Sequence, residues 1–343
     1  MKRREYRNKR VASKRKKHLK IWSVVILGVV LLFSTYGVYL YKKAQSAMDG
    51  AFQETDRDVS SLRDDKVTPY KDNVSILFIG VDDSEVRSDS HSRSDALMLA
   101  TLNNKEKTVK LVSIPRDSLV YIKEVGYQDK ITHAHAFGGV PASINAVEAT
   151  LGVPVDYYVK MNFNAFIDIV DALDGIQVNV PYERVELDEN DKKTIHLMPG
   201  YQKLDGRHAL ALARTRKADN DVERGKRQQM ILQAMMKKAS SVSSISKYGE
   251  VIDAIGGNMA TDLTFNDMKS LLAYLKDGMP EIETISLEGE DDMSTGIYYW
   301  KLDAESLKET SQKLRDHLQL ENGEDPFTNS TKNLTDSANS TNE

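Results

Sequence analysis

Short apolar runs recur through the middle of the chain and indicate buried β-strands. Each run is bounded by polar, turn-like residues. An almost continuous apolar run is typical of a strand that is covered on both faces of its sheet. The expected strands lie at residues 73–81, 95–103, 108–115, 155–161, 175–180 and 282–287.

Helical patterns, in which apolar residues recur every three or four positions, alternate with these strands. They lie at residues 141–152, 164–175, 206–214, 221–239, 264–278 and 303–320. Asn164 is placed to cap the second of these helices, and Gly175 is placed to end it. Residues 185–206 predict a polar excursion or hairpin. Strands interleaved with helices predict an α/β domain with helices on both faces of its sheet.

Residues 21–41 form an uncharged run of 21 residues, which predicts one N-terminal transmembrane helix. At 1.5 Å per residue such a helix covers roughly 30 Å, the thickness of a bilayer's hydrocarbon core. Aromatic residues near both ends, such as Trp22 and Tyr41, suit the two membrane interfaces. A cleaved signal peptide is the alternative, but the run exceeds a usual h-region and residues 42–47 form a poor cleavage site.

Charge is divided unevenly along the chain. Residues 1–20 carry eleven Lys or Arg and one Glu, whereas the other residues comprise 36 basic and 50 acidic groups. The positive-inside rule then keeps residues 1–20 in the cytoplasm and exports the rest, which predicts a single-pass protein of the cell membrane. A basic segment can also bind nucleic acid, but contact with anionic membrane lipid is the expected role here.

Three further segments are expected after the span. Residues 42–72 are polar and charged and predict a stalk, residues 73–320 contain the elements of one exported domain, and residues 321–343 predict a disordered tail. The chain has no cysteine, which excludes disulfides and a thiol nucleophile. P-loop, nucleophile-elbow and zinc-protease motifs are absent from the sequence as well.

Charged residues collect where three of the expected strands begin or end. Ligands of open α/β sheets bind beyond strand ends, so these side chains are expected to form a site. Carboxylates without His or Cys suit a hard cation such as Mg²⁺, which takes one or two of them together with phosphate oxygens. A set of surface ion pairs is the alternative. The residues are Asp82 and Asp83 after the first strand, Arg93 and Asp95 at the second, and Arg116 and Asp117 after the third.

A basic segment at residues 214–229 forms a second candidate site. Asp221 is placed to cap the helix that this segment begins. Guanidinium groups bind phosphate oxygens in bidentate fashion, and a helix N-terminus adds free N–H groups. The excess of basic residues therefore favours a polyanion ligand over a solvated helix face. Side chains expected on one face of the helix are Arg224, Arg227 and Gln228, and two arginines precede it, Arg214 and Arg216.

His133 and His135 lie two residues apart in the segment KITHAHAFGG. On an extended segment both would point to one face, as two ligands of one metal must. No third ligand is evident in the sequence, so a structural or substrate-contacting role is expected for them.

Five segments resemble, in this order, the motifs of the LytR-CpsA-Psr family. They are ILFIGVDDS, RSDALMLATLN, SIPRDS, KITHAHAFGG and ALARTRKADNDVERGKRQQ, and the resemblance covers roughly residues 73–240. It implies an α-β-α sandwich with a central mixed sheet and a hydrophobic groove for a polyprenyl-pyrophosphate lipid. It also implies a Mg²⁺-dependent phosphotransferase that moves an anionic glycan from undecaprenyl pyrophosphate onto peptidoglycan. The glycan would be wall teichoic acid, capsule or a similar polymer.

The resemblance also implies roles for individual residues. The metal-linked carboxylates correspond to Asp82 and Asp95. The pyrophosphate-binding, catalytic arginines correspond to Arg93, Arg116, Arg214 and Arg216. Asp221 is grouped with the catalytic residues, and the substrate-binding positions are Lys130, Arg224, Arg227 and Gln228. The first motif departs from the family pattern, because Asp83 and Ser84 follow Asp82 and the next basic residue is Arg87.

Two other functions remain open at the level of sequence. In a polyprenyl-pyrophosphate hydrolase, water would replace the sugar hydroxyl at the same site. In a membrane-bound transcriptional regulator, residues 1–20 would contact nucleic acid. So short a segment lacks the folded motif with which proteins recognise a DNA sequence. For the transferase, the sequence leaves both Asp95 and Asp221 as candidates for the base that deprotonates the acceptor.

Overall fold

The computed structural model describes residues 34–320 apart from 56, 58, 70, 83–91, 190, 216–220, 241–257 and 275–278. Two compact units divide the chain, Met1–Ser46 and Ala47–Glu343. Residues 34–51 are helical, and no helix among the residues described has the length and apolar content needed to cross a bilayer. Residues 21–33 of the expected span lie outside the described part of the chain, as do the segments 1–20 and 321–343.

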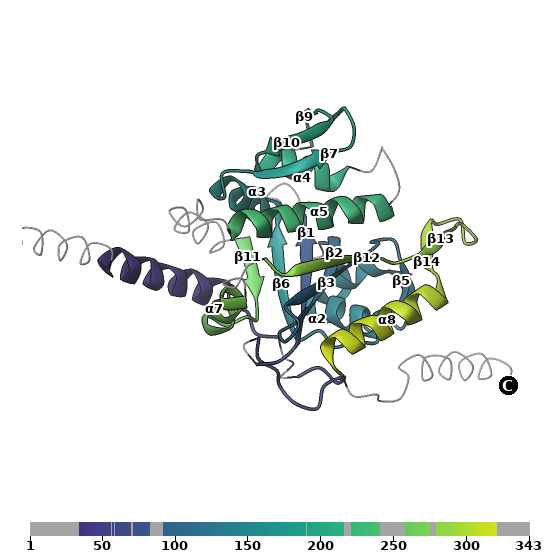
Figure 1. The fold of residues 1–343 in the computed structure, drawn as a ribbon. Coiled ribbons are helices and arrows are strands. Elements are labelled where there is room, and N and C mark those ends of the chain that lie inside the picture. The colour runs from purple at the N-terminus through teal and green to yellow at the C-terminus, as the bar shows by residue number, and fades with distance from the viewer. Residues whose placement is uncertain are drawn as a thin grey trace, which may run out of the picture. The chain divides into compact units, whose positions relative to one another are not determined.

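A six-stranded sheet forms the centre of the second unit (Figure 1). In spatial order its strands are β11 (Met259–Thr261), β6 (Tyr157–Asn162), β1 (Val74–Val81), β2 (Ser94–Asn103), β3 (Thr108–Ile114) and β12 (Glu281–Ser286). β1 is parallel to β6 and β3 is parallel to β12, whereas the other neighbours are antiparallel. The expectation of an α/β fold with a central mixed sheet is therefore confirmed.

Both faces of the sheet are buried. Successive side chains along a strand point to opposite faces, so each strand contributes to two cores. Leu77 and Leu99 contribute to the core on one face, whereas Phe78 and Met98 pack on the other. Figure 1 shows helices on both sides of the sheet, as the sequence predicts. The covering helices are α2 (Ile131–Leu151) and α8 (Ala304–Leu318) on the Leu77 face, and α5 (Asp221–Ala239) on the Phe78 face.

A glycine allows α5 to lie close to the sheet. A Cβ atom at Gly225 would collide with the hydroxyl of Ser113 on β3, and Ser113 is buried. Only glycine fits at this contact without displacing the helix. The first turn of α5, which carries Asp221 and Arg224, is thereby held over the ends of the strands.

A smaller lobe packs on the side of α5 away from the sheet (Figure 1). It comprises α3 (Phe163–Ala172), β7 (Ile176–Val180), β8 (Arg184–Leu187), β9 (Lys193–Leu197), β10 (Gly200–Leu204) and α4 (Gly206–Arg214). Val170, Ile176 and Leu212 of the lobe share a core with Ile231 of α5. β8 pairs with β9, and β10 pairs with β7, so the hairpin expected within residues 185–206 is confirmed.

The cap expected for α3 is wrong. Asn162, rather than Asn164, caps this helix, and its side-chain oxygen accepts a hydrogen bond of 2.9 Å from the N–H of Ala165. The helix begins at Phe163 directly after β6, so Asn164 is already a helical residue. At the other end the C-cap is Leu173, so Asp174 rather than Gly175 is the first left-handed residue, with a φ of +62°. Gly175 follows with a φ of +72°, and its N–H donates to the carbonyl of Val170 at 2.9 Å.

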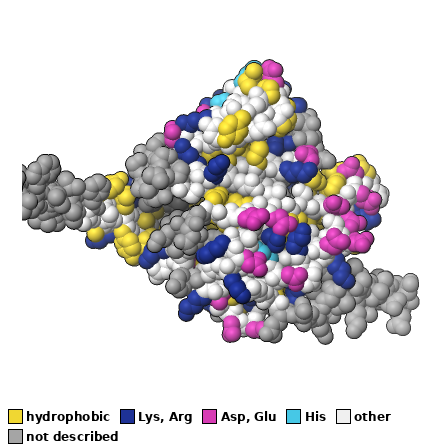
Figure 2. Space-filling model, viewed as in Figure 1, with side chains coloured by type: hydrophobic (Ala, Val, Ile, Leu, Met, Phe, Trp, Pro, Cys, Tyr) yellow, Lys and Arg dark blue, Asp and Glu magenta, His cyan; other side chains and the backbone are white. Residues whose placement is uncertain are grey.

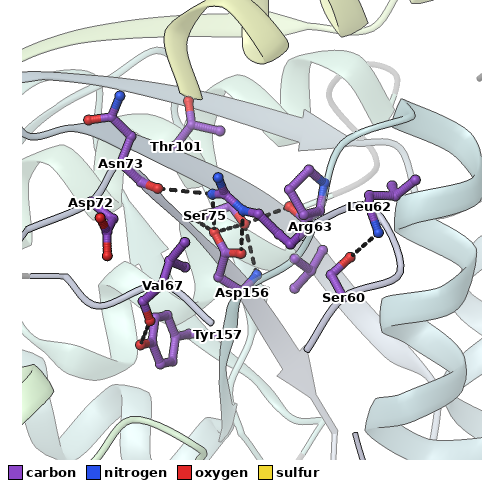
Figure 3. A network of polar contacts seen from close by, with 12 residues as sticks. Ser60, Leu62, Arg63, Val67, Asp72, Asn73, Ser75, Thr101, Asp156 and Tyr157 are labelled. Atoms are coloured by element: carbon purple, nitrogen blue, oxygen red, sulfur yellow. Dashed lines mark hydrogen bonds and ion pairs between the residues drawn. The ribbon is translucent and has the colours of Figure 1, made fainter. Parts of the chain in front are cut away.

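Most of the predicted stalk, from Ala47 onward, is part of the globular unit. Arg63 donates to the two carboxylate oxygens of Asp156 at 3.0 and 2.7 Å, and the hydroxyl of Tyr157 donates to the carbonyl of Val67 at 2.7 Å (Figure 3). The compact unit accordingly begins at Ala47 rather than at residue 73. The polar composition of this segment suggested a linker, but its charged side chains bind buried polar groups of the domain.

Four short strands and one helix complete the described elements of the globular unit. β4 pairs with β5 after β3, and β13 pairs with β14 before α8. Their backbones also meet, because the N–H of Trp300 donates to the carbonyl of Asp117 at 2.8 Å. The elements are β4 (Leu119–Ile122), β5 (Tyr127–Lys130), β13 (Gly289–Asp292), β14 (Tyr299–Leu302) and α7 (Phe265–Tyr274).

Candidate active site

A cavity of about 450 Å³ lies between the sheet, α5 and the smaller lobe. Its walls are largely apolar and include Phe78 of β1, Met98 of β2, Phe166 of α3 and Met235 of α5. These residues come from the middle of the strands and the later turns of α5. Charged side chains line the cavity where β1 ends, where β2 and α5 begin, and along β8 and β9. Such a cavity suits a ligand with a long apolar part and a charged head.

Asp82 and Asp95 both line this cavity, although twelve residues separate them in the sequence. β1 and β2 run antiparallel with Val81 opposite Ser94, so the end of β1 and the start of β2 meet at one edge of the sheet. The structure therefore brings together the two carboxylates that the family resemblance links to a metal.

Two arginines contact Asp95 from different elements. Arg116, which follows β3, forms an ion pair with the Asp95 carboxylate. Arg224, from the first turn of α5, donates to the Asp95 main-chain carbonyl at 2.7 Å and pairs with the Asp221 carboxylate at 3.1 Å. Burial lowers the pKa of Arg224, and the charges of Asp221 and Asp95 oppose that shift. These contacts concentrate positive charge beside the carboxylates at the strand ends.

The carboxyl groups of Asp117 and Asp221 are neighbours, and each affects the ionisation of the other. Burial raises the pKa of Asp221, the charge of Arg224 opposes this shift, and the hydrogen bond to Asp117 adds to it. Burial also disfavours ionisation of Asp117, but hydrogen bonds from Lys130 and Asp221 and the charge of Arg116 outweigh it and lower its pKa. Two adjacent carboxyl groups with pKa values moved apart are an arrangement suited to acid–base chemistry.

Lys130 lies at the outer border of this charged cluster. Its ammonium group is 2.7 Å from a carboxylate oxygen of Asp117, and it lies 5.7 and 5.8 Å from the ring centroids of Tyr298 and Tyr299. Neither Lys130 nor Asp117 lines the cavity, so this contact lies beside it.

Arg214 and Gln228 line the cavity, whereas Arg227 does not. The guanidinium of Arg214 lies 4.4 Å from the ring centroid of Phe163 and donates to the carbonyl of Asp188 at 3.1 Å. Arg227 donates to backbone carbonyls that include Thr215, at 2.6 Å. Arg227 thus connects α4 with α5 in this structure, while Arg214 and Gln228 are within reach of a ligand in the cavity.

The remaining predicted arginines are less informative about the site. Arg93 has an exposed side chain and is not among the cavity-lining residues. Arg216 lies outside the described residues, as do Asp83 and Arg87. The structure therefore brings together Asp82, Asp95, Arg116, Arg214, Asp221, Arg224 and Gln228 from the predicted set, with Lys130 at their border.

The donor groups at the strand ends fit Mg²⁺ better than a softer metal. Within the described residues there is no cluster of three or more His, Cys, Asp and Glu side chains that could hold a metal alone. Mg²⁺ requires no such cluster, because it binds through one or two carboxylates with water and phosphate oxygens completing the shell. Asp82 and Asp95 supply that number of carboxylates beside the cavity.

Sequence reasoning missed several residues of the site. The apolar cavity walls were not found because Phe78 or Met98 has the same pattern in a strand as an ordinary core residue. Arg184 and Lys193, from the hairpin of the lobe, also line the cavity. No local signal relates these hairpin residues to the strand ends, since the contact depends on the folding of the lobe over α5.

The two histidines of KITHAHAFGG do not share a face. α2 begins at Ile131, so the segment is helical rather than extended, and residues two apart point in different directions. His135 is buried, with Nδ1 2.7 Å from the carbonyl of Ser92, whereas Nδ1 of His133 is 2.7 Å from a carboxylate oxygen of Asp129. The extended arrangement that would make them ligands of one metal is therefore not the one observed, and the two side chains have different partners.

Comparison with known proteins points to one family. Residues 35–316 match the LytR_cpsA_psr family. The chain is 39% identical over 314 residues to the polyisoprenyl-teichoic acid–peptidoglycan teichoic acid transferase TagT of Bacillus subtilis (strain 168). That alignment covers 89% of this chain and 97% of the relative.

Solved structures agree with the sequence comparison. A structure of TagT bound to LIIa-WTA is 39% identical, covers 76% of this chain and 97% of its own, and superposes with a TM-score of 0.66. The LytR-CPS2A-psr family protein YwtF (TagT) with bound octaprenyl pyrophosphate lipid is 36% identical, covers 77% of this chain and 97% of its own, and gives a TM-score of 0.63. Both similarities extend over most of the described globular unit.

Proposed function

The chain belongs to the LytR-CpsA-Psr family, and on that premise we propose that it is a glycopolymer–peptidoglycan phosphotransferase. Its donor is an anionic glycan of the teichoic acid class on a polyprenyl-pyrophosphate carrier, and its acceptor is peptidoglycan. A relative that covers most of the chain is a teichoic acid transferase, and a similar structure holds octaprenyl pyrophosphate. The observation that carries the proposal is the apolar cavity whose charged end contains Asp82, Asp95, Arg214 and Arg224.

The cavity supports the donor assignment through its two kinds of lining. Phe78, Met98 and Met235 remove apolar surface from water, which favours a polyprenyl chain by about 25 cal/mol per Å² buried. Arg214 and Arg224 place guanidinium groups where such a lipid would carry its pyrophosphate. Guanidinium groups bind phosphate oxygens in bidentate fashion and stabilise the charge that develops on them during transfer.

Mg²⁺ is the cofactor that we propose for this site, with Asp82 and Asp95 as its protein ligands. When bound, it would neutralise charge on pyrophosphate oxygens. Arg116 orients Asp95 through its ion pair, and Arg224 fixes the backbone of the same residue. The protein thus supplies a carboxylate in a defined position.

The reaction is an exchange of one phosphorus–oxygen bond for another. The acceptor hydroxyl oxygen bonds to the phosphorus that carries the glycan, and the bond from that phosphorus to the bridging oxygen breaks. Polyprenyl phosphate leaves with the electron pair, and the proton of the hydroxyl passes to a base. We assign that base to the Asp117–Asp221 pair, because burial raises the pKa of Asp221 toward the range in which a carboxylate accepts protons effectively.

We further propose that the globular unit acts outside the membrane, anchored by residues 21–41. The basic residues 1–20 support this topology through the positive-inside rule. A reporter that is active only outside the membrane should then be active when fused after residue 320 and inactive when fused at residue 10. The reverse pattern would contradict the proposed location.

Transferase and hydrolase are separated by following the glycan. Full-length protein in detergent is incubated with Mg²⁺, a polyprenyl-pyrophosphate-linked glycan labelled in the glycan, and teichoic-acid-free peptidoglycan. The proposed function requires label that sediments with peptidoglycan and is released by an enzyme that degrades it. Label that appears only as soluble glycan phosphate identifies a pyrophosphate hydrolase instead.

A further inference from the structure

An exposed aromatic surface lies next to the charged cluster and outside the cavity. We call it the aromatic platform and define it by Tyr127, His133, Phe137, Tyr298 and Tyr299. Tyr127 and Phe137 are 51% and 43% exposed, and the other three residues are half-buried. Their ring centroids are 6.4 Å apart, and those of His133 and Phe137 are 6.1 Å apart. None of the five residues lines the cavity. Exposed aromatic rings in mutual contact indicate a binding surface rather than core packing.

A continuous series of contacts joins the platform to the candidate catalytic carboxyl groups. His133 and Tyr299 both contact the carboxylate of Asp129, at 2.7 and 3.5 Å. The next residue, Lys130, lies over the rings of Tyr298 and Tyr299 and is 2.7 Å from a carboxylate oxygen of Asp117. The platform therefore begins where the charged cluster ends.

The platform also has the chemical character of a saccharide-binding surface. Aromatic faces stack on the C–H faces of sugar rings, while tyrosine hydroxyls and a histidine supply polar groups at the ring edges. The carboxylate of Asp129 holds the His133 ring through Nδ1, so the orientation of this side chain is fixed. The platform therefore combines stacking surfaces with side chains of defined orientation.

The charge beside the platform distinguishes between the two glycans of the reaction. Figure 2 shows acidic side chains gathered over the β13–β14 hairpin. β13 contributes Glu290, Asp291 and Asp292, of which Glu290 pairs with Lys301 at 3.0 Å. The hydroxyl of Tyr298 donates to Asp291 at 2.8 Å, which connects this hairpin with the platform. An acidic border repels an anionic teichoic acid more strongly than a strand whose peptides carry amino groups beside their carboxylates. The charge therefore favours the acceptor over the donor polymer.

We propose that the aromatic platform binds the acceptor glycan strand of peptidoglycan and presents its hydroxyl to the Asp117–Asp221 pair. The inference rests on the proposed function, because it requires a donor in the cavity. With the lipid pyrophosphate held from the cavity side, a strand on the platform approaches the same charged cluster from the outer side. Tyr127 and Phe137 are binding residues in this arrangement, and they do not touch the reacting atoms.

The test is a steady-state comparison of full-length variants in detergent, with soluble peptidoglycan tetrasaccharide as the acceptor probe. For Tyr127→Ala combined with Phe137→Ala, we expect the KM for the tetrasaccharide to rise at least ~10-fold, while kcat and the KM for the donor hardly change. Tyr127→Phe and Phe137→Tyr keep the rings and should restore the acceptor KM. Tyr201→Ala, which removes a tyrosine 72% exposed on β10, is the matched control and should leave all constants unchanged.

The possible outcomes separate the inference from the proposed function. An unchanged acceptor KM in the double variant overturns the platform assignment, as does a loss confined to kcat or to the donor KM. If a variant folds poorly, calorimetric titration of the tetrasaccharide with Tyr127→Ala and Phe137→Ala singly replaces the double variant. Equal affinity to wild type then overturns the assignment, and at least ~3-fold weaker binding supports it. Failure of the wild-type chain to label peptidoglycan at all contradicts the proposed function itself.

Discussion

The guanidinium of Arg224 donates a hydrogen bond of 2.7 Å to the main-chain carbonyl of Asp95. This contact joins the first turn of α5 to the start of β2. The same guanidinium is 3.1 Å from the carboxylate of Asp221. One buried side chain therefore positions the backbone of Asp95, the candidate metal ligand, and the side chain of Asp221, a candidate base. Arg224 therefore affects the geometry of the site and the stability of the fold together. Arg214 is 22% exposed and pairs with the exposed Asp191, so its loss should affect a ligand in the cavity more than the fold.

Substitution of Arg224 should lower activity and stability at once. Arg224→Ala leaves the Asp221 carboxyl buried without its cation, and breaking such a pair costs about 3 kcal/mol in the free energy of unfolding. We also expect at least a ~100-fold loss of transfer. Arg214→Ala should lower transfer similarly while the melting temperature stays near that of wild type. Calorimetry beside the transfer assay checks both, with the exposed Lys226→Ala on the same helix as control. Equal melting temperatures for the Arg224 and Arg214 variants would contradict the assignment.

The proposed metal pair is tested by binding as well as by turnover. Asp82→Asn and Asp95→Asn each remove one carboxylate charge from the same edge of the sheet. Each should weaken binding of Mn²⁺, used as a paramagnetic substitute for Mg²⁺, in the presence of inorganic pyrophosphate. Transfer should fall with it and recover in part at higher Mg²⁺ concentration. Glu223→Gln, on the exposed side of α5, serves as control. Unaltered Mn²⁺ affinity in both site variants would exclude these residues as ligands.

Much of the fold follows from local patterns in the sequence. The strands at residues 73–81 and 108–115 were expected because their apolar runs serve both faces of the sheet, and they correspond to β1 and β3. The helix at residues 221–239 was expected with its bounds as observed. The segment around His133 was misassigned because its helical character depends on packing beneath β2, with a kink at Gly138 and Gly139 that interrupts the periodicity.

The candidate site was less accessible to sequence reasoning. Asp82, Asp95 and Arg116 were found because they stand at strand ends, where chain direction alone brings side chains together. The proximity of Asp117 to Asp221 was not predicted, because it depends on the close packing of α5 on β3 that Gly225 allows. Pairings between distant segments have no local signature, and the same is true of the platform residues.

The segment before β1 should contribute to stability rather than serve as a spacer. The side chain of Asp156 is 3% exposed and accepts from Arg63 and from the N–H of Ser75, at 2.8 Å (Figure 3). Arg63→Ala removes the cation that pairs with this buried carboxylate, and we expect a loss of about 3 kcal/mol in the free energy of unfolding. Denaturant titration measures the loss.

A second variant separates lost charge pairing from lost packing. Arg63→Met combined with Asp156→Asn leaves neither partner charged and should recover most of the lost stability. Lys301→Ala, which breaks an exposed pair with Glu290, should leave the denaturation midpoint unchanged. A denaturation midpoint unaffected by Arg63→Ala would show that the segment before β1 acts as a linker.

His317 should make the fold sensitive to mild acid. Its ring nitrogens lie 2.8 Å from the hydroxyls of Thr101 and Thr108 in a buried site. Burial, followed by the charge of Lys110, lowers the pKa of His317 from 6.5 to about 4, and Glu283 opposes that shift. Above pH 6.5 the imidazole is neutral in both states, so it causes no pH dependence there. Between pH 6.5 and about 4 the unfolded chain binds a proton that the folded chain does not, so stability falls as pH falls.

The measurement is the free energy of unfolding of wild type and His317→Gln across this pH range. At 1.36 kcal/mol per pKa unit, the wild-type chain should lose at most about 3 kcal/mol relative to the variant between pH 7 and pH 4. Gln can donate and accept hydrogen bonds but does not titrate, so carboxyl groups elsewhere affect both proteins alike and cancel in the difference. The variant is expected to be less stable at pH 7, because its amide does not reproduce the imidazole geometry, and to approach or pass wild type near pH 4. Parallel curves would show that His317 is protonated as readily in the folded chain as in the unfolded one.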